Sequence, residues 1–307
     1  MKKIIIFMMA LVFVFAAAAC RADDTNAKTQ EGGKITVAVG IVPETSFVKK
    51  IAGDLVDVVT LIPPGNSPAN YQPTAVEMQE LSDAAVYFSM QTPTEEANIL
   101  PKAADFNSGM EIVMLRDIVS VQYPLRYMDA HDHEEDADHQ DGEDAETVDP
   151  HIWLSAKRVI VMVETIADKL AELDPENGGV YSENAEAYIA ELEALDLEIS
   201  ESVSSMGNKT FLIYHGAYGY FSDDYGLTMV SLESEGKPVT AEKMQEVIDY
   251  ATQEGIKTVF YQVEFSDVQA KTVAEEIGGS VTKAEPLSAD YIQGLKDFAE
   301  ALANQGE

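Results

Sequence analysis

Residues 181–206, YSENAEAYIAELEALDLEISESVSSM, form the most periodic stretch of this sequence. Apolar side chains recur there at steps of three and four residues, at Tyr181, Ala185, Tyr188, Leu192, Leu195, Ile199, Val203 and Met206. That spacing predicts an α-helix with one apolar face. At 1.5 Å per residue the helix is roughly 40 Å long, more than most helices of compact domains. We expect a helix of this length in the middle of the chain to join two lobes.

Strand-like and helix-like segments alternate on both sides of this helix. The predicted strands are 34–40, 56–62, 84–88, 111–115, 211–214, 228–232, 258–262 and 280–283. The predicted helices are 43–53, 75–81, 95–102, 155–173, 241–254, 266–277 and one beginning near 290. Alternation of this kind is typical of parallel sheets covered by helices. The predicted fold class is α/β, with an N-terminal lobe (34–178), a linking helix (179–206) and a C-terminal lobe (207–307).

The N-terminus has the features of a secretory signal. Met1-Lys2-Lys3 precedes 16 uncharged, mostly apolar residues, a run too short to span a bilayer comfortably. The run ends in small residues before Cys20, the only cysteine of the chain. We therefore expect a signal peptide over 1–19, a lipid-modified Cys20 and a flexible tether over 20–33. Ordinary cleavage that leaves Cys20 unpaired is the alternative.

The charge balance excludes one class of partner. Without residues 1–19 the chain has 18 basic side chains against 54 acidic ones, a formal net charge of −36. Nucleic acid phosphates would be repelled by such a protein, whereas cations would be attracted. A generally acidic, solvated surface explains the charge equally well.

A histidine-bearing acidic loop precedes a rigid hexapeptide. Of the 21 residues from Asp129 to Asp149, 11 are Asp or Glu, and three more are His131, His133 and His139. The hexapeptide Asp149–Leu154 follows, with His151 after a proline and with the only Trp of the chain. A flexible acidic arm beside a rigidly presented imidazole indicates a site for a divalent cation. A merely solvated charge run is the alternative for the arm.

The remaining histidine, His215, follows the predicted strand 211–214. Ligands of parallel α/β sheets bind beyond the carboxyl ends of the strands. His151 and His215 lie on opposite sides of the long helix in the sequence, as a pair of inter-lobe ligands would. A single histidine is more often a hydrogen-bonded structural residue, so the pair is better evidence than either member.

The segment Asp149–Ser155 resembles the D-P-H-x-W-L-S/D signature of the metal-binding lipoproteins that serve zinc and manganese ABC importers (the cluster A-I solute-binding proteins). Three other motifs of this family occur in the same order, in Pro64–Thr74, Phe211–Leu227 and Glu285–Leu287. The acidic loop sits where zinc-type members carry a similar insertion. The resemblance implies two lobes joined by a rigid helix, a metal site between them and a small closing movement.

The chain departs from the family pattern at two of these motifs. The first loop usually reads P-H-x-Y-E-P, but Ala69 stands here in place of the histidine, and Glu285 replaces the usual last Asp. The resemblance therefore implies His151, His215 and Glu285 as ligands, with one position open. A water molecule can fill that position, as can Asn66, Asn70, Tyr71, Gln72 or the auxiliary histidines His131, His133 and His139.

The ligand types favour zinc. Manganese-type relatives generally have Glu where this chain has His215, and imidazole suits zinc, whereas carboxylate and water suit manganese. Manganese or another divalent transition metal is the alternative. Thiolate ligation is excluded because Cys20 lies in the tether.

These observations predict an extracytoplasmic, lipid-anchored and monomeric bacterial receptor that is not an enzyme. It captures zinc and delivers it to the membrane permease of an ABC importer. A metal-binding surface adhesin is the second hypothesis, by analogy with some relatives. A zinc hydrolase is the third, since two imidazoles, a carboxylate and an open position also describe a hydrolytic site. The H-E-x-x-H spacing and an evident general base beside His151 are absent from the sequence.

Overall fold

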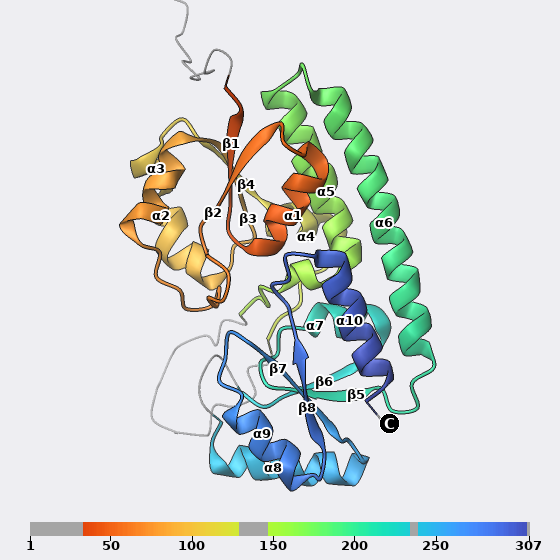
Figure 1. The fold of residues 1–307 in the computed structure, drawn as a ribbon. Coiled ribbons are helices and arrows are strands. Elements are labelled where there is room, and N and C mark those ends of the chain that lie inside the picture. The colour runs from red at the N-terminus through yellow and green to blue at the C-terminus, as the bar shows by residue number, and fades with distance from the viewer. Residues whose placement is uncertain (1–32, 129–146, 234–238, 306–307) are drawn as a thin grey trace, which may run out of the picture. The chain divides into compact units, whose positions relative to one another are not determined.

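The computed structural model describes residues 33–128, 147–233 and 239–305. Two four-stranded sheets, both parallel throughout, organise these residues (Figure 1). The first sheet has the order β2 (Val56–Thr60), β1 (Ile35–Val39), β3 (Ala84–Ser89) and β4 (Glu111–Met114). The second has the order β6 (Thr228–Ser231), β5 (Thr210–Ile213), β7 (Thr258–Gln262) and β8 (Ser280–Ala284). The predicted α/β fold class with two lobes is confirmed.

Helices cover both faces of each sheet, as parallel sheets require. In Figure 1, α2 and α3 lie on one side of the first sheet and α1 and α5 on the other, whereas α8 and α9 cover one side of the second. The helices are α1 (Val42–Ala52), α2 (Ala75–Glu80), α3 (Leu100–Phe106), α4 (Leu115–Gln122), α5 (Ala156–Leu173), α6 (Gly178–Ser204), α7 (Gly219–Tyr225), α8 (Ala241–Glu254), α9 (Val268–Glu276) and α10 (Tyr291–Ala303). Three short turns of other helix types are η1 (Leu81–Asp83), η2 (Glu95–Ile99) and η3 (Ile152–Leu154).

The long helix α6 contains the predicted apolar stripe. Its buried residues are Tyr181, Ala185, Tyr188, Leu192, Leu195, Ile199 and Val203, and Met206 packs against the same core just beyond its end. Helices α5, α1 and α10 pack against α6. Since α10 belongs to the C-terminal lobe and α1 to the N-terminal lobe, one continuous core includes residues of both.

Two short helices were not predicted. Leu115 begins α4 instead of ending a strand, and Gly219 begins α7 in the segment after His215, where no helix is predicted. Most of the seven residues of α7 are buried, so its sequence shows no alternation between an apolar and a polar face.

Polar contacts between the lobes hold the segments around the hexapeptide in place. The indole nitrogen of Trp153 donates to the carbonyl oxygen of Pro286 (2.8 Å), and the hydroxyl of Tyr291 donates to the carbonyl oxygen of Trp153 (2.7 Å). The guanidinium of Arg158, on α5, pairs with Asp224, on α7 (3.0 Å). These groups are buried or nearly so, which makes their hydrogen bonds costly to break.

None of the helices in the described ranges has the length and apolar character needed to cross a lipid bilayer. The predicted signal peptide and Cys20 lie outside the described residues, as do His131, His133 and His139.

Candidate metal site

His151 is held in a turn of the N-terminal lobe. It directly precedes the short turn η3, and Ser155 after that turn caps α5 by accepting a hydrogen bond from the amide of Arg158 (3.3 Å). The side chain is almost entirely buried, with 7% of the residue exposed. The ring of Trp153 lies beside the imidazole, with 5.2 Å between the ring centroids. These contacts give the imidazole one fixed position.

His215 comes from the C-terminal lobe, two residues beyond the end of β5. Gln262, the last residue of β7, fixes its backbone in both directions. The side-chain NH2 group of Gln262 donates to the backbone carbonyl oxygen of His215 (2.7 Å). The backbone N–H of His215 donates in turn to the side-chain oxygen of Gln262 (3.2 Å). The site therefore lies at the carboxyl ends of parallel strands, as the sequence predicts.

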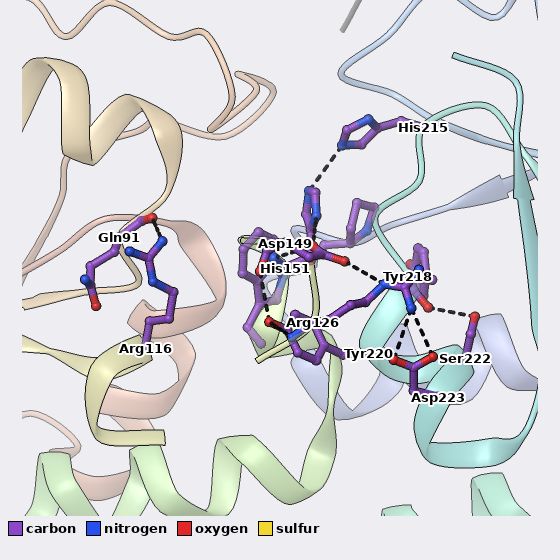
Figure 2. Close-up of polar contacts among 12 residues, drawn as sticks. Gln91, Arg116, Arg126, Asp149, His151, His215, Tyr218, Tyr220, Ser222 and Asp223 are labelled. Atoms are coloured by element: carbon purple, nitrogen blue, oxygen red, sulfur yellow. Dashed lines mark hydrogen bonds and ion pairs between the residues drawn. The ribbon is translucent and has the colours of Figure 1, made fainter. Parts of the chain in front are cut away.

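The two imidazoles face each other (Figure 2). The Nε2 atoms of His151 and His215 are 3.1 Å apart. Two nitrogens bound to one tetrahedral zinc ion, each at 2.0–2.1 Å from the metal, are roughly 3.3 Å apart. The spacing of the pair thus fits a shared zinc ion closely.

A carboxylate lies behind each imidazole. Nδ1 of His151 is 2.8 Å from a carboxylate oxygen of Asp149, and Nδ1 of His215 contacts the Glu233 carboxylate. A carboxylate accepts hydrogen bonds, so the proton of each neutral ring resides on Nδ1. Each Nε2 then carries a lone pair directed at the other ring. Two lone pairs at 3.1 Å repel each other unless a cation or a proton lies between them.

Burial favours a metal ion over a proton at His215. Burial is the largest effect on the pKa of this imidazole and lowers it below the usual value, although the hydrogen bond to Glu233 opposes the shift. The positive charge of a protonated His151 would lower it further. Near neutral pH, His215 is therefore a neutral imidazole, which is the form that binds metals.

The imidazole pair opens onto a small pocket between the lobes. The pocket is lined by residues of five segments: Ser67, Pro68 and Ala69 of the first loop; His151 and Trp153; His215 and Ala217; Glu264 and Phe265; and Pro286 and Leu287. The predicted absence of an imidazole from the first loop is visible here, since Ala69 contributes only a methyl group. None of Asn66, Asn70, Tyr71 and Gln72, the predicted candidates for the open position, lines this pocket.

Among the described residues, Glu264 is the one acidic residue that lines the pocket. One of its carboxylate oxygens, Oε2, is buried and has no hydrogen-bond partner among the described residues. Burial raises the pKa of this carboxyl, and the negative charge of Glu285 raises it further. A hydrogen bond from its own backbone amide and the positive charge of Lys283 oppose this rise in the pKa without cancelling it.

Glu285 lies near the pocket without lining it. Its carboxylate pairs with Lys283 and its side chain is 49% exposed, whereas the next two residues, Pro286 and Leu287, do line the pocket. Its role as a ligand stays a prediction. Among the described residues, no three His, Cys, Asp or Glu side chains are gathered closely enough to hold a metal ion by themselves. The structure thus brings together the two imidazoles and leaves the carboxylate ligand to be assigned.

Sequence reasoning missed three acidic residues of this site. The sequence motif contains Asp149 but does not identify it as the partner of His151, and no motif marks Glu233 or Glu264. Glu233 and Glu264 follow strands β6 and β7 by two residues, so the strand-end rule that selects His215 also selects them. Because the chain has 54 acidic side chains, however, that rule does not distinguish these two residues from the other acidic residues.

Residues 37–305 match the protein family described as ZnuA, the periplasmic component A of the zinc-uptake complex. The chain is 29% identical to the zinc-binding lipoprotein AdcA of Streptococcus pneumoniae serotype 4, over 100% of this chain and 58% of AdcA. It thus spans little more than half the length of such curated relatives. It is 28% identical to the manganese-binding lipoprotein MntA of Halalkalibacterium halodurans, over 96% of this chain and 92% of MntA.

Solved structures share the fold. A crystal structure of ZnuA has a TM-score of 0.80 at 31% identity, covering 90% of this chain and 100% of that chain. The laminin-binding protein Lmb of Streptococcus agalactiae, described as a bifunctional protein with adhesin and metal-transporting activity, has a TM-score of 0.74 at 21% identity, over 89% of this chain and 100% of Lmb. At that identity the likeness to Lmb concerns the fold alone.

Proposed function

Because this chain belongs to the family of the periplasmic component A of zinc-uptake complexes, we propose that it is an extracytoplasmic solute-binding protein that captures a divalent metal ion and delivers it to the permease of an ABC importer. The favoured metal is zinc, with manganese as the alternative. The observation that supports the proposal best is the pair of Nε2 atoms at 3.1 Å, each on a ring whose other nitrogen faces a carboxylate.

The proposed ligands are His151 and His215, with a carboxylate as the third. The family resemblance implies Glu285 as this ligand. Its carboxylate would then leave its ion pair with Lys283 to bind the metal. His151 and His215 come from different lobes, so the metal joins the lobes when it binds. The buried contacts of Trp153 and Arg158 across the lobes favour a small movement on release.

The remaining proposals concern the parts of the chain outside the described residues. Cys20 is proposed to carry a lipid anchor after removal of residues 1–19, and the protein to act as a monomer. His131, His133 and His139 are proposed to raise the local metal concentration near the site.

The adhesin hypothesis is not favoured, because its structural support is a likeness of fold. The hydrolase hypothesis gains nothing from relatives described as binding and uptake proteins.

Calorimetric zinc titration of the purified protein tests this function. We expect His151→Ala combined with His215→Ala to abolish the high-affinity site, because both nitrogens of the proposed pair are then lost. A variant with His131, His133 and His139 all replaced by Ala is expected to retain that site and to lose only weaker binding. Zinc affinity unchanged in the double variant of His151 and His215 contradicts the proposal.

A further inference from the structure

The first-loop residues that line the pocket offer no strong metal ligand. They are Ser67, Pro68 and Ala69. The hydroxyl oxygen of Ser67 accepts a hydrogen bond from the amide of Ala69 (3.3 Å), so the loop folds back on itself. A metal ion bound by His151 and His215 therefore needs its further protein donors from another segment.

The C-terminal lobe presents Glu264 to the same pocket. Strands β5 and β7 pair in parallel, with Leu212 opposite Val259 and Ile213 opposite Phe260. Parallel pairing brings the carboxyl ends of both strands to one edge of the sheet. His215 and Glu264, each two residues beyond its strand, consequently reach the pocket from adjacent positions.

One oxygen of the Glu264 carboxylate lacks the hydrogen-bond partner that buried oxygens normally have. Its Oε2 is buried and accepts no hydrogen bond from the described residues. The nearby ammonium group of Lys283 pairs with Glu285 instead. Buried polar atoms in native proteins are almost always satisfied, and an exception calls for a ligand, an ion or a water molecule. A divalent cation on the facing imidazole pair supplies the missing positive charge.

We propose that Glu264 is a metal ligand and that it takes the place of the imidazole that Ala69 cannot provide. This inference rests on the proposed function and specifies its site. Because no three His, Cys, Asp or Glu side chains are gathered closely enough in the described residues, the Glu264 side chain must move towards the imidazole pair when the metal binds. The C-terminal lobe then supplies His215, Glu264 and the proposed ligand Glu285, while the N-terminal lobe supplies His151 alone. A carboxylate oxygen in place of an imidazole nitrogen makes the ligand set harder in the acid–base sense. The difference between the zinc and manganese affinities of the site is then smaller.

Metal affinity of Glu264→Gln tests the proposal. The variant keeps the size of the side chain and removes its charge, so we expect zinc affinity to fall roughly 10- to 100-fold, the range typical of losses around metal sites. Manganese affinity should fall by a larger factor, because manganese depends more on carboxylate oxygen. Competition with a chromophoric chelator measures both. Glu276→Gln, an exposed glutamate on α9 of the same lobe, is the matched control and should bind as the unaltered chain does.

The melting temperature without metal separates ligation from a structural role. Because the Oε2 atom of Glu264 has no partner in the described structure, Glu264→Gln should leave the metal-free melting temperature unchanged or raise it. A lower melting temperature with unchanged zinc affinity assigns Glu264 a structural role and overturns the proposal. Zinc affinity within about twofold of the unaltered chain overturns it at any melting temperature.

Introduction of an imidazole at position 69 tests the replacement itself. If Glu264 stands in for that imidazole, Ala69→His should restore most of the zinc affinity lost in Glu264→Gln and add less to the unaltered chain, as coupled residues do. Equal gains in both backgrounds overturn the replacement. Failure of this inference is distinct from failure of the proposed function, because the double variant of His151 and His215 loses zinc in either case.

Discussion

The two imidazoles of the site are backed by carboxylates in different surroundings. Asp149 accepts two hydrogen bonds from His151, from the backbone amide (3.0 Å) and from Nδ1 (2.8 Å), and its second oxygen lies 3.3 Å from Arg126. Glu233 contacts Nδ1 of His215 through one oxygen, and its second oxygen is buried without a partner in the described part of the chain. Asp149 has a cationic partner besides its imidazole, whereas Glu233 has only the imidazole among the residues that the structure describes.

The different surroundings indicate different roles: Asp149 positions the imidazole of His151, whereas Glu233 acts on His215 through its negative charge. Asp149 belongs to a network that also crosses between the lobes, since Arg126 pairs with Asp223 of α7 (3.0 Å) and the hydroxyl of Tyr220 donates to the carbonyl oxygen of Asp149 (3.0 Å), as Figure 2 shows in part. Its main effect is therefore to hold His151 in place. Glu233, whose partner in the described structure is the imidazole of His215, mainly makes that imidazole a more basic ligand.

Asp149→Asn should have the larger effect. If the NH2 group of the new amide faces Nδ1 of His151, the proton of the imidazole is forced onto Nε2. If the NH2 group faces Arg126 instead, two hydrogen-bond donors meet with no acceptor between them. We expect zinc affinity to fall roughly 100-fold, the upper end of the range for partners of metal-bound histidines. Calorimetric titration measures the loss. Asp223→Asn removes the exposed partner of the same arginine and should cost less than about fivefold. Equal losses in both variants would mean that Arg126 and not His151 mediates the effect.

Glu233→Gln should have a smaller effect at neutral pH, roughly tenfold, because the amide oxygen still accepts from Nδ1. Its clearest consequence concerns pH. The folded-state pKa of His215 lies below its unfolded value, so the stability that His215 contributes is complete above about pH 6.5 and is lost as pH falls towards the folded-state pKa. Since the Glu233 hydrogen bond raises this pKa, the variant should lower it further.

Zinc titrations between pH 8 and pH 5 measure that shift. The acidic decline of zinc affinity should begin at lower pH in Glu233→Gln than in the unaltered chain, because protons compete less well for His215. Glu242→Gln, an exposed residue of α8, serves as the control and should leave the profile in place. A decline displaced to higher pH contradicts the charge role assigned to Glu233.

The sequence predicted the framework and the imidazoles but not their carboxylate partners. The strands and the long helix could be predicted because their apolar residues follow the periods of the structures that bury them, as the stripe of α6 does. Helix α7 could not, because most of its residues are buried and no polar face marks it. The chain has few histidines, so the positions of His151 beside a turn and His215 after a strand could be recognised from the sequence. Acidic residues are abundant, and three-dimensional contacts were needed to separate Glu233 and Glu264 from the surface.

The central claim is that one metal ion lies between the Nε2 atoms of His151 and His215. Anomalous diffraction at the zinc absorption edge, from crystals of the zinc-loaded protein, tests it most directly. We expect one dominant zinc peak at roughly 2.0–2.1 Å from both nitrogens, with Asp149 and Glu233 still on the opposite nitrogens of the rings. A protein that binds zinc tightly but shows its peaks only on surface carboxylates, with no metal between the two imidazoles, contradicts the account.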